Sequence, residues 1–342
     1  TLTRYAGHMR QAGMSRDEID AALQIINANR CEPPLPDKEV SKIAKSIERY
    51  EPDQISVAVI ENHFGQMVGS NNDSHYEIED PGTIPDSLLS VPGFVSEVMD
   101  ISLSTAPYPN QAIAFCGALT LMAFLAGRKV RDVGDNRTNI YVLGLAHSAS
   151  GKDWPRKVNT KILHHIGLED CLGDRFASGE GIQDAMVSTP SMLFQSDEID
   201  GMLQSVSKSK DARNESIMGT LLTLYSSANN IFPMRRKAGS EAAGTIDQPN
   251  LVLFGTAIPN HYYAALNERM LTTGFFARML SVESARRSEG QEPGIIELSK
   301  RVIEIAEWWA NFHPSGSGIL NKRSPVPSII EATEPATRLI KE

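Results

Sequence analysis

The sequence predicts an α/β fold built on a mainly parallel sheet, with a small all-α domain ahead of it. Over most of the chain, short apolar runs of strand length alternate with longer stretches of helical period, the pattern of strand–helix–strand units. The first fifty residues differ, because only helical periodicity and helix-boundary signals occur there. Strands are expected at residues 139–145, 191–196 and 251–254.

The N-terminal domain is expected to contain three helices. The first is amphipathic and covers residues 2–12. Ser15 and Glu18 predict a capping box at the start of the second helix, in which the serine caps the helix and the glutamate returns the bond. A Pro-rich break follows, and Asp37 is placed to cap a third helix over residues 38–50.

We expect this helical domain at residues 1–50, a linker at 51–88 and the α/β domain at 89–342. The linker has little periodicity and many turn-forming residues, apart from a short structured piece at 55–60. Further helices are expected at residues 91–102, 109–126, 155–165, 213–228 and 296–312, and the chain ends in a helix-like segment at 331–342.

A loop of small residues joins the strand at 139–145 to the helix at 155–165. Backbone N–H groups at such a helix start bind anions, and a lysine there reaches the outer phosphates of a nucleotide. The loop departs from the usual G-x-x-x-x-G-K-[ST] pattern, because Ala146 replaces the first glycine, although Gly144 could relax the turn. The alternative is an ordinary small-residue turn before a helix. The candidate phosphate-binding residues are Ser148, Ala149, Ser150, Gly151, Lys152 and Asp153.

Two acids, Asp197 and Glu198, follow the strand at 191–196. Enzymes with a phosphate-binding loop need a carboxylate at the end of a neighbouring strand for Mg²⁺ and a residue that positions or activates water. We expect Asp197 to hold Mg²⁺ and Glu198 to activate the water. Asp153 stands where a hydroxyl is usual, and its carboxylate is a suitable Mg²⁺ ligand, directly or through water. The alternative is an acid pair that stabilises a helix N-terminus.

A third polar segment follows the strand at 251–254, with Thr256 and Asn260 as candidates to sense the terminal phosphate or hold the water. For Asn260 a helix cap is the alternative. In a parallel sheet the ligand binds at the carboxyl ends of the strands, where all three segments fall. The expected fold class is therefore an α/β P-loop NTPase of the AAA+/RecA-like, additional-strand type, with ATP and Mg²⁺ bound.

A single arginine and a run of three cations complete the candidate sites. Arg278 lies alone in an apolar segment and needs an anionic partner, either a phosphate on a neighbouring subunit or a structural salt bridge. Three consecutive cations, Arg235, Arg236 and Lys237, lie in a hairpin or long loop between the helix at 213–228 and the strand at 251–254. They predict contacts to the phosphates of single-stranded DNA; the alternative is a solvated loop.

Composition limits the function classes. The net charge of −9 disfavours a nucleic-acid coat but allows a local basic channel. The three cysteines form no CxxC pair and the eight histidines no ligand cluster, which argues for a reducing compartment and against zinc. No secretory signal is present, and the longest apolar stretch, at 111–127, is shorter than the about 18 residues of a membrane span. We expect a cytoplasmic protein, in a bacterium or a phage-infected host, that makes no membrane contact.

Residues 1–50 carry a recognisable pattern. Its parts are Ala6-Gly7, Gly13-Met14-Ser15, Asn27, Pro33-Pro34-Leu35, Glu39-Val40, Ile43-Ala44 and Ser46. On these residues the domain resembles the primase C-terminal helical domain of phage and plasmid replication proteins, in which it links a primase or primase-polymerase to a helicase. The alternative is a generic three-helix bundle.

The rest of the chain, from about residue 85, carries a second set of motifs. They are Ser150-Gly151-Lys152-Asp153, Ser178-Gly179-Glu180, Ser196-Asp197-Glu198, Gly255-Thr256-Ala257-Ile258-Pro259 and Gly274-Phe275-Phe276-Ala277-Arg278. They resemble the helicase-like ATPases that follow the primase-linked domain in phage and prophage proteins. An acid after the lysine is familiar in that group, whereas the absent first glycine departs from it.

These resemblances imply the ATP-dependent helicase motor of a primase-helicase, translocating on single-stranded DNA as a homo-oligomeric ring, a hexamer. The resemblance also implies a covalently linked primase or polymerase domain outside this chain. Primase activity itself is not expected here, since residues 1–88 hold no second paired-carboxylate unit. Two alternatives stay open. One is a P-loop ATPase that acts as a loader or defence switch without unwinding. The other is a nucleotide-binding scaffold with degenerate catalysis.

Overall fold

The structure, a computed structural model, divides into two compact units, Thr1–Glu79 and Asp80–Glu342. The division falls within the expected linker. Residues 51–83 of that linker, which include the short structured segment expected at 55–60, lie outside the described residues. The structure describes residues 2–11, 13–31, 33–47, 84–197, 199, 201–202, 212–235, 244–266, 274–284, 287–314 and 324–341.

The first unit contains the three expected helices, α1 (Leu2–Gln11), α2 (Arg16–Arg30) and α3 (Asp37–Ile47). The capping box is present, because Ser15 Oγ accepts the Glu18 amide and the Ser15 amide donates to the Glu18 carboxylate. Asn27 is buried and binds both the N–H and the C=O of Leu35, at 2.9 and 2.8 Å. This pair of bonds fixes the Pro-rich break between α2 and α3 and closes the helices on a core of Leu2, Ala6, Ile19, Leu23, Val40, Ala44 and Ile47.

The second unit is built on a five-stranded sheet in which every pair of neighbours is parallel, which confirms the expected α/β class. The strand order across the sheet is β3, β4, β7, β2, β8. Their bounds are β2 (Tyr141–Leu145), β3 (Leu172–Gly173), β4 (Ser191–Ser196), β7 (Asn250–Ala257) and β8 (Met279–Glu283). β7 is longer than the predicted strand at 251–254, so Thr256 lies inside the strand and not after it.

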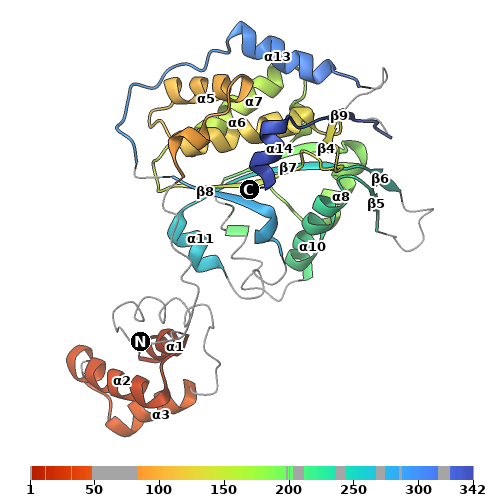
Figure 1. Ribbon diagram of the computed structural model, residues 1–342. Coiled ribbons are helices and arrows are strands. Elements are labelled where there is room, and N and C mark those ends of the chain that lie inside the picture. The colour runs from red at the N-terminus through yellow and green to blue at the C-terminus, as the bar shows by residue number, and fades with distance from the viewer. Residues whose placement is uncertain are drawn as a thin grey trace. The chain divides into compact units, whose positions relative to one another are not determined.

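Helices cover both faces of this sheet (Figure 1). One face packs against α5 (Phe94–Thr105), α6 (Gln111–Ala126), α7 (Trp154–His165) and α13 (Lys300–Asn311). The other packs against α8 (Gly179–Ser188), α10 (Ala212–Ser226) and α11 (Pro259–Ala265). α6 is the expected buried helix: it lies at the centre of the first layer, and almost all of its residues are inaccessible.

Smaller elements border the sheet. β1 (Val130–Asp132) pairs in parallel with β9 (Ser328–Ile330), and β5 (Ile231–Pro233) pairs antiparallel with β6 (Thr245–Asp247), so the segment around 231–246 is a hairpin. A C-terminal helix, α14 (Glu334–Lys341), follows β9. The described residues also contain short 3₁₀ turns: η1 (Asp86–Leu89), η2 (Glu169–Cys171) and η3 (Phe276–Arg278). None of the described helices is long and apolar enough to span a bilayer.

Two buried cations that follow α6 bond to elements distant in sequence. The Arg128 guanidinium donates to the carbonyls of Gln248 and Asp247 next to β6. Lys129 Nζ donates to the carbonyl of Trp309 in the last turn of α13, where a cation is favoured by the helix dipole. Lys129 is only 3% exposed, and this burial lowers its pKa to about 8.

The buried ammonium of Lys129 predicts a pH dependence of stability. The folded state loses this proton near pH 8, whereas the unfolded chain keeps it until about pH 10.4, so the free energy of unfolding should rise across that window. The gain is at most about 3 kcal/mol. Chemical denaturation of the wild type and of Lys129→Met between pH 7 and 10.5 measures it: the variant should lose this rise. An identical pH profile in the two proteins would contradict the assignment.

Candidate functional site

The loop after β2 has a strained turn at its centre. Ala149 and Gly151 both adopt positive φ, 58° and 71°. Glycine takes this conformation freely, whereas alanine pays about 1 kcal/mol, so the surrounding structure must hold Ala149 in place. Gly144 does not relax the turn as expected: it lies inside β2, where an added Cβ would come within 2.7 Å of Ile113 in α6.

The segment that precedes α6 braces this loop. Asn110 caps α6 through its side-chain oxygen and donates its amide to the carbonyl of Ser150 at 3.1 Å. Gly151 packs so closely on Tyr108 that an added Cβ would lie 2.2 Å from the Tyr108 carbonyl oxygen. Trp154, at the start of α7, donates to Thr105 Oγ1 at 2.8 Å. The loop is therefore fixed from one side before any ligand arrives.

The braced loop leaves polar groups unused. Within the part of the chain that the structure describes, the amides of Ser148, Ala149 and Gly151 donate to no acceptor. Ser150 is 3% exposed, and its hydroxyl has no hydrogen-bond partner there either. A turn of free amides at the start of a helix is a favourable place for an anion, because the positive end of the helix dipole adds to it.

Asp197 joins three elements at the carboxyl edge of the sheet. One of its oxygens accepts the hydroxyl of Thr256 in β7 at 2.9 Å, and the other lies 2.8 Å from the guanidinium of Arg156 in the first turn of α7. Thr256 is fully buried, so its hydroxyl positions Asp197. The structure thus brings two of the predicted residues, Asp197 and Thr256, into contact beside the helix that follows the loop.

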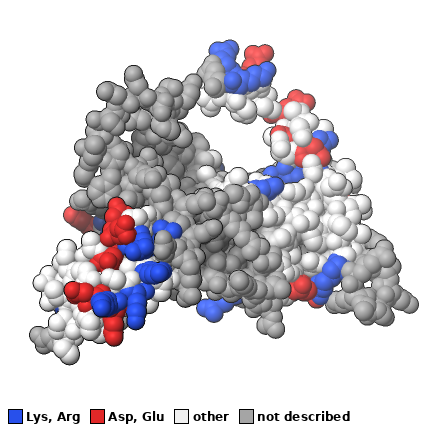
Figure 2. Space-filling view, turned by 90° about the horizontal axis from the view of Figure 1, so that it is seen from below, with Lys and Arg blue, Asp and Glu red and all other residues white. Residues whose placement is uncertain are grey.

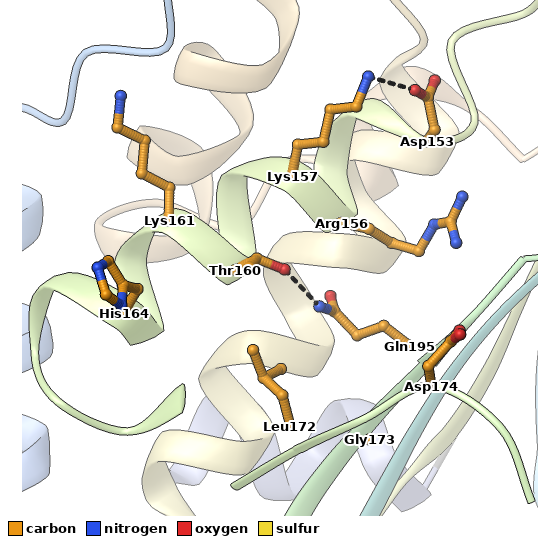
Figure 3. A pocket seen from close by; sticks show the side chains of 10 residues that line it. All are labelled: Asp153, Arg156, Lys157, Thr160, Lys161, His164, Leu172, Gly173, Asp174 and Gln195. Atoms are coloured by element: carbon orange, nitrogen blue, oxygen red, sulfur yellow. Dashed lines mark hydrogen bonds and ion pairs between the residues drawn. The ribbon is translucent and has the colours of Figure 1, made fainter. Parts of the chain in front are cut away.

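Asp153 has a different partner from the one expected. It occupies the N-cap position of α7 without capping it, and its carboxylate pairs with Lys157 at 2.6 Å. Both residues line a pocket of about 650 Å³ between α7 and the β3–β4 edge (Figure 3). Arg156 extends from the same helix on the side of Asp174, and Gln195 in β4 lies against Thr160 of α7.

Buried amides position α7 over the sheet. Asn159 is 1% exposed and donates to the Gly117 carbonyl of α6 and to Gln195 of β4, each at 2.9 Å. Gly117 is required here, since an added Cβ would lie 2.5 Å from the Pro155 Cβ. The first turn of α7, which carries Arg156, therefore has little freedom to shift.

Helix α11 and strand β8 contribute a further pair at the carboxyl edge. Tyr263 of α11 donates its hydroxyl to Glu283 at the end of β8, at 2.9 Å. Burial and this bond to a carboxylate raise the pKa of Tyr263 to about 12. Asn260 lies in the first turn of α11 and is exposed, and the helix cap is Ile258, so the capping alternative for Asn260 is wrong.

Arg278 lies at the opposite edge of the sheet. The next residue, Met279, begins β8 and pairs with Tyr141, the first residue of β2. β2 runs for five residues from Tyr141 to the loop, which separates Arg278 from the loop by about 16 Å along the strand direction. The Arg278 guanidinium donates to the Gly274 carbonyl at 2.8 Å and lies over the Tyr225 ring. Among the described residues it has no carboxylate partner, so the expected alternative of a structural salt bridge is not seen.

The basic hairpin is only partly described. Arg235 donates to the Glu180 carbonyl and pairs with Asp184, both in α8, so its guanidinium has a structural role. Arg236, Lys237 and the catalytic candidate Glu198 lie outside the described residues. On the face drawn in Figure 2, acidic and basic side chains of the described residues are interspersed, with no broad patch of one sign. Of the described residues, no three His, Cys, Asp or Glu side chains form a metal-binding group.

Sequence reasoning missed Arg156 and the bracing residues Tyr108 and Asn110. A signal for Arg156 was available: a cation in the first turn of a helix is disfavoured by the dipole, so it calls for an acidic partner. Asn110 matches an N-cap signal at the start of α6. Nothing in the sequence indicates the contact of Tyr108 with the loop, because it depends on tertiary packing.

The close contact of Gly151 predicts a large effect of Gly151→Ala. The variant must pay for positive φ and for the collision with the Tyr108 carbonyl, so we expect a loss of about 2–4 kcal/mol of stability. Gly167→Ala is the matched control, because its φ is also 71° but no atom lies within 4 Å of the added Cβ. Urea denaturation compares them: equal losses would contradict the bracing of the loop by Tyr108.

Comparison with known families gives a context for the first unit alone. Residues 1–53 match the family described as Primase C terminal 1 (PriCT-1). A search of curated proteins returned no match. This match supports a primase-associated C-terminal domain at residues 1–53 and a primase-related replication context.

Proposed function

We propose that the second unit is an ATP-hydrolysing P-loop motor that serves as the helicase part of a phage- or plasmid-type primase-helicase. The observation that carries this proposal is the meeting of Asp197 with Thr256 and the first turn of α7 at the carboxyl edge of the sheet. Such enzymes require a metal-binding carboxylate beside the loop that holds the phosphates. The primase-associated domain ahead of this unit supports a role in replication.

The strand order gives independent support. In P-loop enzymes of the additional-strand type, one strand separates the strand before the phosphate loop from the strand that ends in the metal-binding acid. β7 lies between β2 and β4 in this way. The free amides after β2 fit a triphosphate, and Lys152 would reach its β- and γ-phosphates.

The metal would bind beside Asp197 and Asp153. Both carboxylates already hold a cation, Arg156 and Lys157 respectively. We propose that Asp197 and Asp153 would hold Mg²⁺ directly or through water in place of these cations, and that Thr256 would keep Asp197 oriented. Glu198, the next residue, would activate the attacking water.

A ring of identical chains would complete the site. Arg278 lies about 16 Å along the sheet from the loop of its own chain, so it would act on a nucleotide held by a neighbouring copy. Arg236 and Lys237 would contact the phosphates of single-stranded DNA without reading its sequence. A hexamer is the ring size that we propose.

A second candidate function has one observation in its favour. Arg235, the first cation of the proposed DNA-contacting hairpin, is held by Asp184 in α8. A hairpin tied to the body of the domain would suit a P-loop ATPase that acts as a loader or switch and does not pull on DNA.

Turnover tests the proposed function directly. The full chain should hydrolyse ATP in the presence of Mg²⁺, and Lys152→Ala and Glu198→Gln should each lower kcat by at least about a hundredfold, because they remove phosphate binding and water activation. Single-stranded DNA should stimulate the wild type, and a forked duplex should be unwound. Hydrolysis without unwinding would favour the loader or switch. Wild-type turnover in Glu198→Gln would exclude Glu198 as the residue that activates water, and absence of turnover in the wild type would exclude the enzyme.

The Arg156–Asp197 pair predicts a change in the Mg²⁺ requirement. If the metal must displace Arg156, Arg156→Gln should lower the Mg²⁺ concentration at half-maximal activity about two- to fivefold, the strength of a partly exposed ion pair. Lys161→Gln is the control. It removes a cation from the same helix, but the partner of Lys161 is the Ile296 carbonyl and not a carboxylate. An unchanged Mg²⁺ dependence in Arg156→Gln would argue that the metal does not meet Asp197.

A further inference from the structure

A second polar pocket lies at the amino edge of the sheet, away from the loop after β2. It has a volume of about 270 Å³ and is lined by the segment at 135–140, the C-terminal end of α10 and Arg278. Amide groups hold its walls together: Asn139 donates to the Tyr225 carbonyl at 3.1 Å, and Asn229 donates to the Asp135 carbonyl at 3.4 Å. The pocket is therefore built from three segments that are distant in sequence.

Two guanidinium groups border this pocket. The Arg137 side chain is 92% buried, and its Nη2 atom pairs with Asp135 at 2.9 Å. Its Nε and Nη1 atoms are buried and have no hydrogen-bond partner among the residues that the structure describes. The Nη1 group of Arg278 donates a hydrogen bond to the Gly274 carbonyl. Burying a guanidinium with unused N–H groups is costly, and an acceptor that enters beside it recovers that cost.

The charges around the pocket do not balance. Asp135 is the one acid among the pocket's lining residues, and it is shared, because Arg131, which does not line the pocket, lies 3.5 Å from it. Arg137 and Arg278 therefore both line a pocket in which Asp135 is the one acidic lining residue. Burial is the main cause that lowers the pKa of Arg137, and the neighbouring Arg131 lowers it further, while Asp135 and Asp247 oppose that shift.

We propose that this pocket binds a phosphate group through Arg137 and Arg278. Guanidinium forks match the oxygens of phosphate in pairs, and two of them at one pocket are a common basis for such recognition. A volume of about 270 Å³ accommodates a phosphate with its bound water but is small for a whole nucleotide. The phosphate is either free in solution or the terminal phosphate of a nucleotide on a second copy of the chain.

Binding of inorganic phosphate tests the proposal without relying on ATP hydrolysis. The full chain with Lys152→Ala, in which the loop after β2 has lost its lysine, is titrated with phosphate against chloride at equal ionic strength. Phosphorus NMR line broadening and the melting temperature report binding. Adding Arg137→Gln or Arg278→Gln should weaken binding about tenfold each, the loss of one charge-assisted contact. Arg137→Lys, which keeps the charge but not the fork, should fall between.

Arg131→Gln is the matched control, since it removes a cation bonded to Asp135 that does not line the pocket, and it should bind phosphate as before. Absence of binding, or equal binding in all four variants, overturns the proposal. An equal mixture of Lys152→Ala and Arg137→Gln chains then identifies the source. Recovery of ATP hydrolysis in the mixture assigns the phosphate to a nucleotide on a second copy, whereas binding without recovery assigns it to free phosphate.

Discussion

The parallel direction of all five strands is the constraint on which the candidate site depends. Because no neighbouring pair is antiparallel, every loop that follows a strand opens at the same edge of the sheet. The chain uses that edge for Asp197 after β4, Thr256 near the end of β7 and the small-residue loop after β2. Residues 59 positions apart in sequence thus come within hydrogen-bond distance without any irregular excursion of the backbone.

Rigidity at this edge comes from the layer that contains α6. Asn110 serves at once as the cap of α6 and as a donor to the loop, and Gly117 and Asn159 fix α7 against α6 and β4. These contacts explain how the loop can keep a positive φ at Ala149 although it lacks the usual first glycine. The conformational cost of about 1 kcal/mol is small beside the packing of a helix that is buried on all sides.

Local sequence patterns correctly predicted features that depend on neighbouring residues, such as a strand, a helix cap and a buried helix. The strand at 191–196 is found at those residues, the capping box of Ser15 and Glu18 is present, and α6 is buried as its composition indicates. The short strands β1, β3 and β9 were not predicted, because two or three residues carry no periodicity and their pairing is decided by the sheet. The same reasoning placed Asp153 and Asp197 as acids near a metal but could not foresee Lys157 and Arg156 as their partners, which side-chain packing selects.

The position of Arg278 in the sheet limits which anionic partner it can reach. In sequence it is a lone cation in an apolar segment, with either a phosphate or a carboxylate as a suitable partner. The register of β8 against β2 places it at the amino edge, beyond the reach of one side chain from the loop of its own chain. If its partner is the phosphate of a bound nucleotide, that nucleotide must belong to another copy. Self-association would then be a requirement of the chemistry, because Arg278 and the loop after β2 lie at opposite edges of the sheet, the length of a strand apart.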